Sequence, residues 1–131
     1  CGVLMVTTPQ QVAVSDVRRS IHMFRQVGVP VLGLVENMSY LICGCCGERT
    51  SIFGEGGGEQ MAAELSVPLM GQVPIDSKIC AGGDTGMPLP LADETAPLSK
   101  VFAAIALGLN KTFSPSTRSV AASTAVSKSL A

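Results

Sequence analysis

Two short apolar runs flank a segment with the hydrophobic spacing of a helix. The runs are residues 3–6 (VLMV) and 31–35 (VLGLV), and runs this short and this rich in β-branched residues are typical of strands buried on both faces. Between them, apolar residues recur every three or four positions: Val14, Val17, Ile21 and Phe24. A strand, a helix and a strand joined by short connections predict a βαβ crossover with parallel strands.

The ends of this first helix are also marked in the sequence. Thr8 has the pattern of an N-cap, with Pro9 at the first helical position and Gln11 completing a capping box. Gly28 supplies a C-terminal stop, and Pro30 prevents the helix from continuing.

The rest of the chain extends the α/β pattern. We expect an irregular segment over 36–53, a helix near 57–65 and a strand near 67–73. We expect residues 76–92 to be a loop with at most one helical turn, and 98–109 to form a final amphipathic helix. This order is that of the second half of an open α/β sheet, in which ligands bind at the carboxyl ends of the strands.

The chain divides into a domain over 1–111 and a tail over 112–131. Nine of the last 20 residues are Ser or Thr and none is acidic, which predicts a disordered tail. At the other end, Cys1 leads directly into the first apolar run. Because a natural chain rarely begins inside a strand, we expect that the domain is partial and that its N-terminal half is missing.

Composition excludes several partners. The net charge is -1 and aromatic residues make up 4%, which argues against nucleic-acid binding by charge or by stacking. No run approaches the roughly 20 apolar residues of a membrane span. Three cysteines crowded into four positions indicate a reducing compartment. We expect a chain that is not secreted, located in the cytoplasm, or in the mitochondrial or plastid matrix if the source is eukaryotic.

Three of the five cysteines stand within four positions, in 43–46 (CGCC). Cys43 and Cys46 form a C-x-x-C pair, which allows a metal site, a redox disulfide or inert thiols. A redox pair is expected at the start of a helix, whereas this pair lies in a loop, which favours metal. Since a tetrahedral site takes four ligands, two chains could supply Cys₄, or Cys45 or Cys80 could complete a site within one chain.

Polar residues follow two of the predicted strands. Asn37 comes directly after a buried run, and its amide suits a purine edge or, alternatively, a simple loop cap. Pro74, Ile75 and Asp76 form either a plain turn or a rigid wall and a carboxylate beside a ribose. The glycine cluster at 54–58 (GEGGG) lacks the GK[ST] ending of a phosphate-binding loop, so we interpret it as a flexible loop entering a helix.

Five motifs in a fixed order carry a resemblance to a known family. They are 6–10 (VTTPQ), 35–39 (VENMS), the C-x-x-C pair, 52–58 (IFGEGGG) and 73–76 (VPID). Over about residues 2–110 the chain resembles the Mrp/nucleotide-binding-protein (NUBPL/Ind-like) family of iron–sulfur cluster carriers, within the MinD-like P-loop ATPases. The resemblance implies the C-terminal half of a parallel-sheet P-loop NTPase domain.

The resemblance also implies cofactors and roles. The family is an ATPase that binds ATP with Mg²⁺ through a Walker A loop in its N-terminal half, a loop that this chain lacks. It holds a [4Fe–4S] cluster between the two chains of a homodimer and passes it to apo-proteins. The cluster ligands map onto Cys43 and Cys46, the base contact onto Asn37, and the adenine and ribose loop onto Pro74, Ile75 and Asp76.

Two departures from the family keep alternatives open. Gly44 stands where many members have proline, and Cys45 is an extra thiol. The alternatives are a zinc-stabilised structural or interaction module and a MinD- or ParA-like positioning ATPase. No catalytic residue is assigned within this chain.

Overall fold

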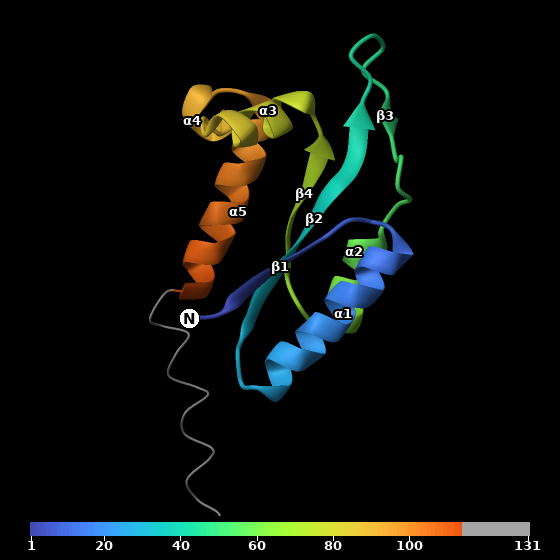
Figure 1. Ribbon diagram of the computed structural model, residues 1–131, viewed down its shortest axis with the longest axis vertical. Helices are drawn as coiled ribbons and strands as arrows, with labels where there is room; N and C mark the ends of the chain where they lie inside the picture. Colours follow the sequence, from blue (N-terminus) through green and yellow to red (C-terminus); the bar gives the residue numbers. More distant parts are fainter. Residues whose placement is uncertain (114–131) are drawn as a thin grey trace, which may run out of the picture.

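The computed structural model describes residues 1–113, which form an α/β fold (Figure 1). The elements follow one another as β1 (Val3–Thr7), α1 (Gln11–Gln26), β2 (Val31–Ile42), β3 (Arg49–Thr50), α2 (Gly57–Glu64), β4 (Leu69–Ile75), α3 (Ser77–Thr85), α4 (Leu89–Ala92) and α5 (Pro97–Phe113). None of the helices in this part of the chain combines the length and the apolar character that crossing a membrane requires.

Strand β2 is the centre of the sheet. It pairs in parallel with β1, where Met5 lies opposite Leu34, and in parallel with β4, where Asn37 lies opposite Val73. The two-residue β3 pairs antiparallel with the far end of β2. The predicted βαβ crossover from β1 through α1 to β2 is therefore confirmed.

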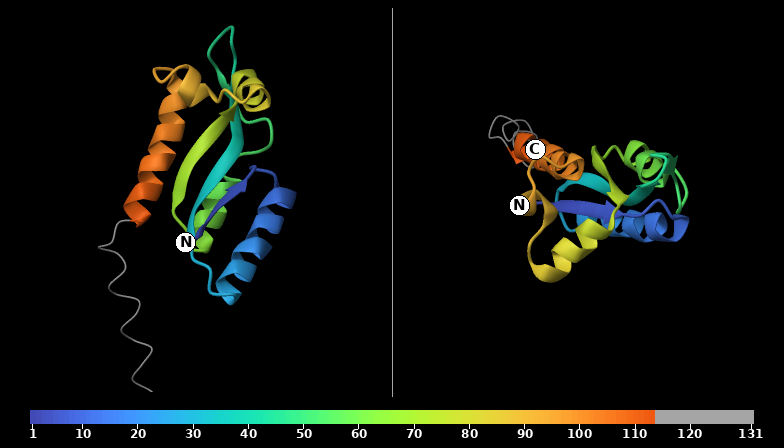
Figure 2. Two further views of the ribbon diagram at one scale, coloured as in Figure 1. Left: turned by 60° about the vertical axis from the view of Figure 1, so that its left-hand side comes forward. Right: turned by 90° about the horizontal axis from the view of Figure 1, so that it is seen from above.

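Helices cover both faces of the sheet. Helices α1 and α2 pack on one face over a core whose innermost side chains are Ile21, Leu34 and Met61. Helix α5 packs on the other face against Val35 and Val73 through Ile105. Figure 2 shows the sheet between these two helical layers, and this arrangement leaves the strand ends free at one edge.

Strand β1 is less buried than its apolar sequence predicts. The prediction of burial on both faces is wrong, because Val6 is 52% exposed. Among the described residues β1 pairs with β2 alone, and α5 lies over β4 and β2. Met5 packs into the core beneath α1, but the other side of β1 is incompletely covered.

One end of α1 follows the sequence signals and the other does not. At the C-terminus, Gly28 has a φ of +73° and its N–H donates to Arg25, while the Val29 N–H donates to Phe24. These are the two bonds of a Schellman motif. At the N-terminus the capping box is wrong, because α1 starts at Gln11 and the buried Thr8 hydroxyl makes no hydrogen bond in the described structure.

Strand β2 runs seven residues past the predicted end at Val35. The expectation of an irregular 36–53 segment is corrected, since β2 continues to Ile42 and returns through β3 as a hairpin. Met38 makes this possible with a left-handed φ of +56°, and the register with β4 slips between Asn37 and Leu41. Strand β2 therefore bends at Met38 and continues, where the sequence predicts that it ends.

The segment after β4 is also more ordered than expected, since it forms α3 and α4. The Asp76 carboxylate accepts a 2.7 Å hydrogen bond from the Lys78 N–H and caps α3, whereas Gly82 and Gly83 make the helix look like a loop in sequence. The predicted helix over 98–109 is confirmed as α5, which begins one residue earlier at Pro97 and continues to Phe113, two residues past the predicted domain boundary. The rest of the predicted tail, 114–131, lies outside the described residues.

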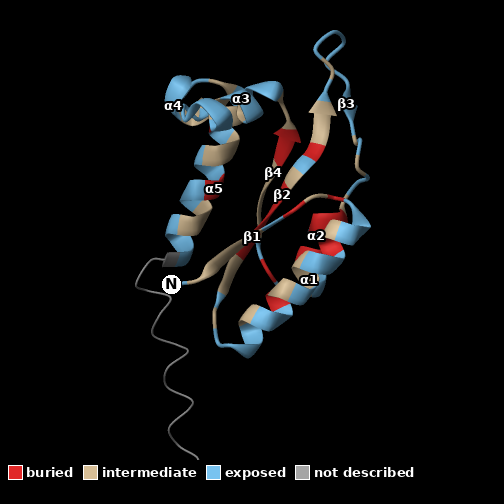
Figure 3. Cartoon of the chain, in the orientation of Figure 1, coloured by how far each residue is buried: buried red, intermediate tan, exposed pale blue. Residues whose placement is uncertain are grey.

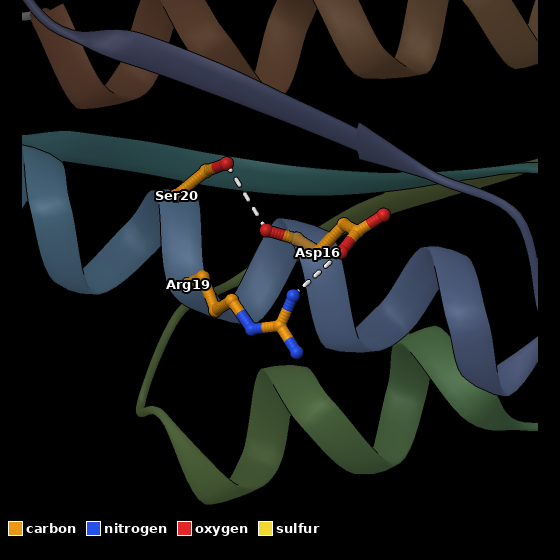
Figure 4. A network of polar contacts seen from close by, with 3 residues as sticks. All are labelled: Asp16, Arg19 and Ser20. Atoms are coloured by element: carbon orange, nitrogen blue, oxygen red, sulfur yellow. Dashed lines mark hydrogen bonds and ion pairs between the residues drawn. The ribbon is translucent and has the colours of Figure 1, made fainter.

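Polar contacts on α1 are of two kinds. Asp16 accepts hydrogen bonds from Arg19 and Ser20 within the helix (Figure 4), and exposed contacts of this kind contribute little to stability. Arg18 instead forms a 2.6 Å ion pair with Glu64, and Arg25 donates to the Leu65 carbonyl. These two contacts join α1 to α2.

Figure 3 colours parts of β2, β4 and α2 as buried. Glu36 in β2 is the most buried charged side chain described, with 1% of its surface exposed. One carboxylate oxygen accepts from the Gly58 N–H at 2.6 Å. The other accepts from Ser39 Oγ at 2.7 Å and Gln72 Nε2 at 3.1 Å. Three donors satisfy the buried carboxylate, as burial of a charge requires, and tie β2 to α2 and β4.

The glycine cluster is explained by this contact. A Cβ atom on Gly58 would lie 2.7 Å from the Glu36 carboxylate, and one on Gly57 would collide with the Pro9 carbonyl. Close packing therefore requires glycine at both positions. The prediction of a helix near 57–65 is confirmed, and the interpretation as a flexible loop is wrong for residues 57 and 58, which form the first turn of α2.

We predict that Gly58→Ala lowers the free energy of unfolding by about 1–3 kcal/mol, the usual cost of overpacking. The matched control is Gly83→Ala in α3, where a Cβ meets open space and should stabilise by roughly 0.5–1 kcal/mol through helix propensity. Urea unfolding followed by circular dichroism gives both values. A Gly58→Ala chain as stable as the parent would contradict the close-packing explanation.

Candidate metal centre and nucleotide pocket

The C-x-x-C pair lies at the tip of the hairpin between β2 and β3, which projects beyond the sheet (Figure 1). The hairpin is closed by hydrogen bonds from the Cys43 N–H to the Glu48 carbonyl and from the Gly47 N–H to the Cys43 carbonyl, each 2.9 Å. Gly47 has a φ of +71°, which a residue with a side chain rarely adopts. The loop therefore turns tightly around Cys43.

The turn points backbone donors at the Cys43 sulfur. Hydrogen bonds from the Cys46 N–H, the Cys45 N–H and the Cys46 thiol lower the pKa of Cys43 from its ordinary value. Metals bind the thiolate form of cysteine, and N–H donors stabilise that form before any metal arrives. The arrangement suits Cys43 and Cys46 as ligands of one metal centre.

Of the remaining thiols, Cys45 lies in the same turn, whereas Cys1 and Cys80 come from other parts of the fold. Cys1, Cys45 and Cys80 are exposed and free, and Cys80 contacts Asp84 in α3. In the described part of the chain, no three His, Cys, Asp or Glu side chains are grouped so that they could hold a metal ion. The Cys43 and Cys46 thiols are thus close together, and neither Cys45 nor Cys80 joins them in a group of three possible ligands, so the pair is a candidate half-site.

Asn37 lies beside the kink in β2. Its amide oxygen accepts from the Met38 N–H at 2.9 Å, next to the left-handed residue, which is the contact expected of a loop-capping asparagine. The oxygen is thus used locally, and only the amide nitrogen remains to donate to a ligand. Asn37 lies opposite Val73 in β4 and so comes within one residue of the Pro74 turn.

Pro74, Ile75 and Asp76 line a pocket of about 350 Å³ at the carboxyl ends of β2 and β4. Its other lining residues come from β2 and the α3–α5 cap: Tyr40, Ile42, Lys78, Leu89, Asp93, Ala96, Pro97, Leu98 and Val101. Asn37 is not among them. Pro74 and Ile75 end strand β4 and Asp76 caps α3, so the expected plain turn is wrong. The structure brings these three residues together in a cavity and places Asn37 opposite Val73, outside the cavity lining.

The two carboxylates of the pocket already accept hydrogen bonds from the protein. Asp76 caps α3, and Asp93 accepts from the Thr95 hydroxyl at 2.7 Å and the Thr95 N–H at 2.9 Å. These two bonds lower the pKa of Asp93, with a smaller contribution from the positive charge of Lys78. The walls are otherwise mostly apolar, which is typical of a pocket for a small organic ligand.

Sequence reasoning missed two residues of this region. The sequence gives one signal for Glu36: a carboxylate that directly follows an apolar run and precedes Asn37 can be buried at the end of the strand. Tyr40 was overlooked because 36–53 was expected to be irregular, and only the continuation of β2 places its ring in the pocket wall.

The fold places the chain in a known structural class. The structure resembles P-loop NTPase domains of the MinD type: MinD from Pyrococcus furiosus matches with a TM-score of 0.62 and 23% identity, covering 82% of this chain and 41% of that one. A nucleotide-binding protein from Archaeoglobus fulgidus, solved in complex with ADP, matches with a TM-score of 0.61 and 35% identity, covering 77% and 40%. The likeness to MinD shows the fold alone.

Residues 1–110 match the family described as "ParA: NUBPL iron-transfer P-loop NTPase", and the chain belongs to this family. An iron-sulfur cluster carrier protein from Pseudomonas fragi is 41% identical over 106 residues, 81% of this chain and 37% of that protein. The iron-sulfur cluster transfer protein NUBPL of Dictyostelium discoideum is 43% identical over 99 residues, covering 76% and 31%. The chain thus spans about a third of the length of these relatives.

We predict that Cys43 in the folded, metal-free chain is alkylated by iodoacetamide with a midpoint at lower pH than in denaturant. The N–H bonds favour the thiolate, so reactivity should persist as the pH falls. By linkage, the lowered pKa stabilises the fold above the unfolded-state pKa, and this contribution is lost as the pH falls through the folded-state pKa. Peptide mass spectrometry measures the rates, and identical midpoints would contradict the hydrogen-bonded turn.

Proposed function

We propose that the chain is the C-terminal portion of an ATP-dependent iron–sulfur carrier that holds a [4Fe–4S] cluster between two copies and passes it to apo-proteins. The observation that carries the proposal is the Cys43 turn, in which N–H donors surround a thiol with a lowered pKa at an exposed hairpin tip. Membership of the iron-transfer family supports the identity of the cargo.

Two copies are proposed because the half-site is incomplete. A cluster iron is held by cysteine thiolates, with four ligands in a [4Fe–4S] site. Cys43 and Cys46 supply two of them, and a second copy supplies the same two again. Because the hairpin projects from the sheet (Figure 2), a second hairpin can approach it without moving the core.

The nucleotide is proposed to place its base at the carboxyl edge of the sheet. Asn37 would donate from its amide nitrogen to the base, and Pro74, Ile75 and Asp76 would form a wall beside adenine and ribose. The position at the strand ends supports this placement, because that edge is where open α/β sheets bind ligands. The Walker A loop, with Mg²⁺ and the phosphates, would come from residues outside this chain.

The proposed compartment is a reducing one, either the cytoplasm or, in a eukaryote, the mitochondrial or plastid matrix. Five free thiols in the described structure suit a compartment in which glutathione keeps cysteines reduced. The client proteins are proposed to be apo forms of iron–sulfur proteins that approach the exposed hairpin.

We predict that Cys43→Ser and Cys46→Ser each reduce bound iron to background and abolish the cluster-dependent dimer. Cys45→Ser is the matched control in the same turn, and it should retain both, because only its backbone N–H contributes to the site. Anaerobic reconstitution, iron and sulfide analysis and size-exclusion chromatography give the readouts. A colourless protein with bound zinc would favour the zinc-stabilised module, and loss of iron in Cys45→Ser alone would move the ligand assignment.

We predict that Asn37→Ala weakens ATP binding by about tenfold in the full-length protein, since one hydrogen bond to a desolvated base contributes on the order of 1–3 kcal/mol. Cluster content should stay unchanged, because Asn37 is six residues away from Cys43 in β2 and the hairpin. Equilibrium binding of a fluorescent ATP analogue, competed by ATP, measures the effect. Equal affinities in variant and parent would refute the placement of the base.

A further inference from the structure

Tyr40 belongs both to the pocket and to the stem of the cysteine hairpin. Its ring lines the pocket together with Pro74 and Ile75. Along β2 it stands three residues before Cys43, and Ile42, the residue adjacent to Cys43, lines the same pocket. The pocket and the hairpin therefore share a wall.

Arg49 links the two strands of the hairpin through its side chain. It pairs with Ile42 in the two-residue β3, and its guanidinium carbon lies 3.9 Å from the centroid of the Tyr40 ring. A cation over an aromatic face at this distance is an attractive cation–π contact. Arg49, which packs on one face of the Tyr40 ring, thus lies in β3, the strand that follows the cysteine turn.

The position of Arg49 depends on closure of the hairpin. Strand β3 consists of Arg49 and Thr50, both exposed, and two backbone hydrogen bonds close the turn around Cys43. A short exposed pairing of this kind is marginally stable by itself. A metal centre that binds Cys43 and Cys46 fixes the turn and with it the guanidinium above the ring.

We propose that Tyr40 is a contact for the adenine base in the pocket and that Arg49 is a positioning residue that couples the pocket to the cysteine turn. The proposal rests on the proposed function, because it takes an adenine nucleotide as the ligand. Coupling between two sites is reciprocal, so metal at the cysteines strengthens nucleotide binding and nucleotide strengthens metal binding. The expected factor is about two- to fivefold, the ratio that corresponds to one exposed cation–π contact.

The Tyr40 ring is the probe for the test. In the full-length protein, the NMR ring signals of Tyr40 are identified as those lost in Tyr40→Phe. ADP is titrated into the full-length protein, once without metal and once with Zn²⁺ alone, a diamagnetic ion that thiolates bind. We expect the Tyr40 signals to shift saturably, with an apparent Kd about two- to fivefold lower in the presence of Zn²⁺.

Variants separate a positioning role from a merely structural one. Arg49→Met should remove the zinc dependence of the Kd, while Arg49→Lys, which keeps the cation, should retain part of it. Tyr40→Phe should preserve the coupling and Tyr40→Leu should weaken ADP in both states, with the shared Pro74–Asp76 signals as the readout. Arg19→Met, which removes an exposed contact on α1, is the control and should change nothing.

The outcomes distinguish this proposal from the proposed function. If ADP shifts the Pro74–Asp76 signals but not Tyr40, or if Arg49→Met keeps the full zinc dependence, the coupling is overturned while the base site stands. If ADP shifts neither set of signals, the base site fails and the coupling fails with it. Loss of iron in Cys43→Ser and Cys46→Ser would still support the carrier in either case.

Discussion

The buried carboxylate of Glu36 is the contact on which the arrangement of the site depends. A charge that is 1% exposed is tolerated because Gly58, Ser39 and Gln72 all donate to it. Removing any donor leaves a buried acceptor short of a partner, which is costly in a low-dielectric interior. The network therefore fixes three elements at once: β2, the first turn of α2 and β4.

The same network determines where β2 goes next. Ser39 donates to both the carboxylate and the main-chain carbonyl of Glu36, so the two residues are bridged across the left-handed Met38. The bridge stabilises a kink that would otherwise be strained. Beyond it, Tyr40 lines the pocket and Cys43 stands at the hairpin tip, so a hydrogen-bonded kink precedes both candidate sites.

The strand and helix pattern could be predicted from sequence wherever burial imposes a period. The βαβ crossover, α2, β4 and α5 follow from apolar spacing, and Gly28 ends α1 as its sequence indicates. The rest depends on contacts between distant residues: β2 passes Val35 because Glu36 is satisfied by α2 and β4, which no local pattern reveals. At the candidate site, the C-x-x-C pair lies in a loop as expected and Pro74–Asp76 line a pocket, whereas Tyr40 enters the pocket lining only because β2 is extended.

The open edge of β1 has a consequence for how the chain behaves in solution. In the described structure β1 pairs with one strand only, and Val6 presents an apolar surface beside its unpaired backbone groups. Such an edge is a template for strand addition, so two copies can associate there without any thiol taking part. Association at this edge would be indifferent to chelators, whereas the proposed cluster-bridged dimer would be sensitive to them. Of the self-associated protein, only the part that a chelator dissociates would be evidence for a metal site at the cysteines.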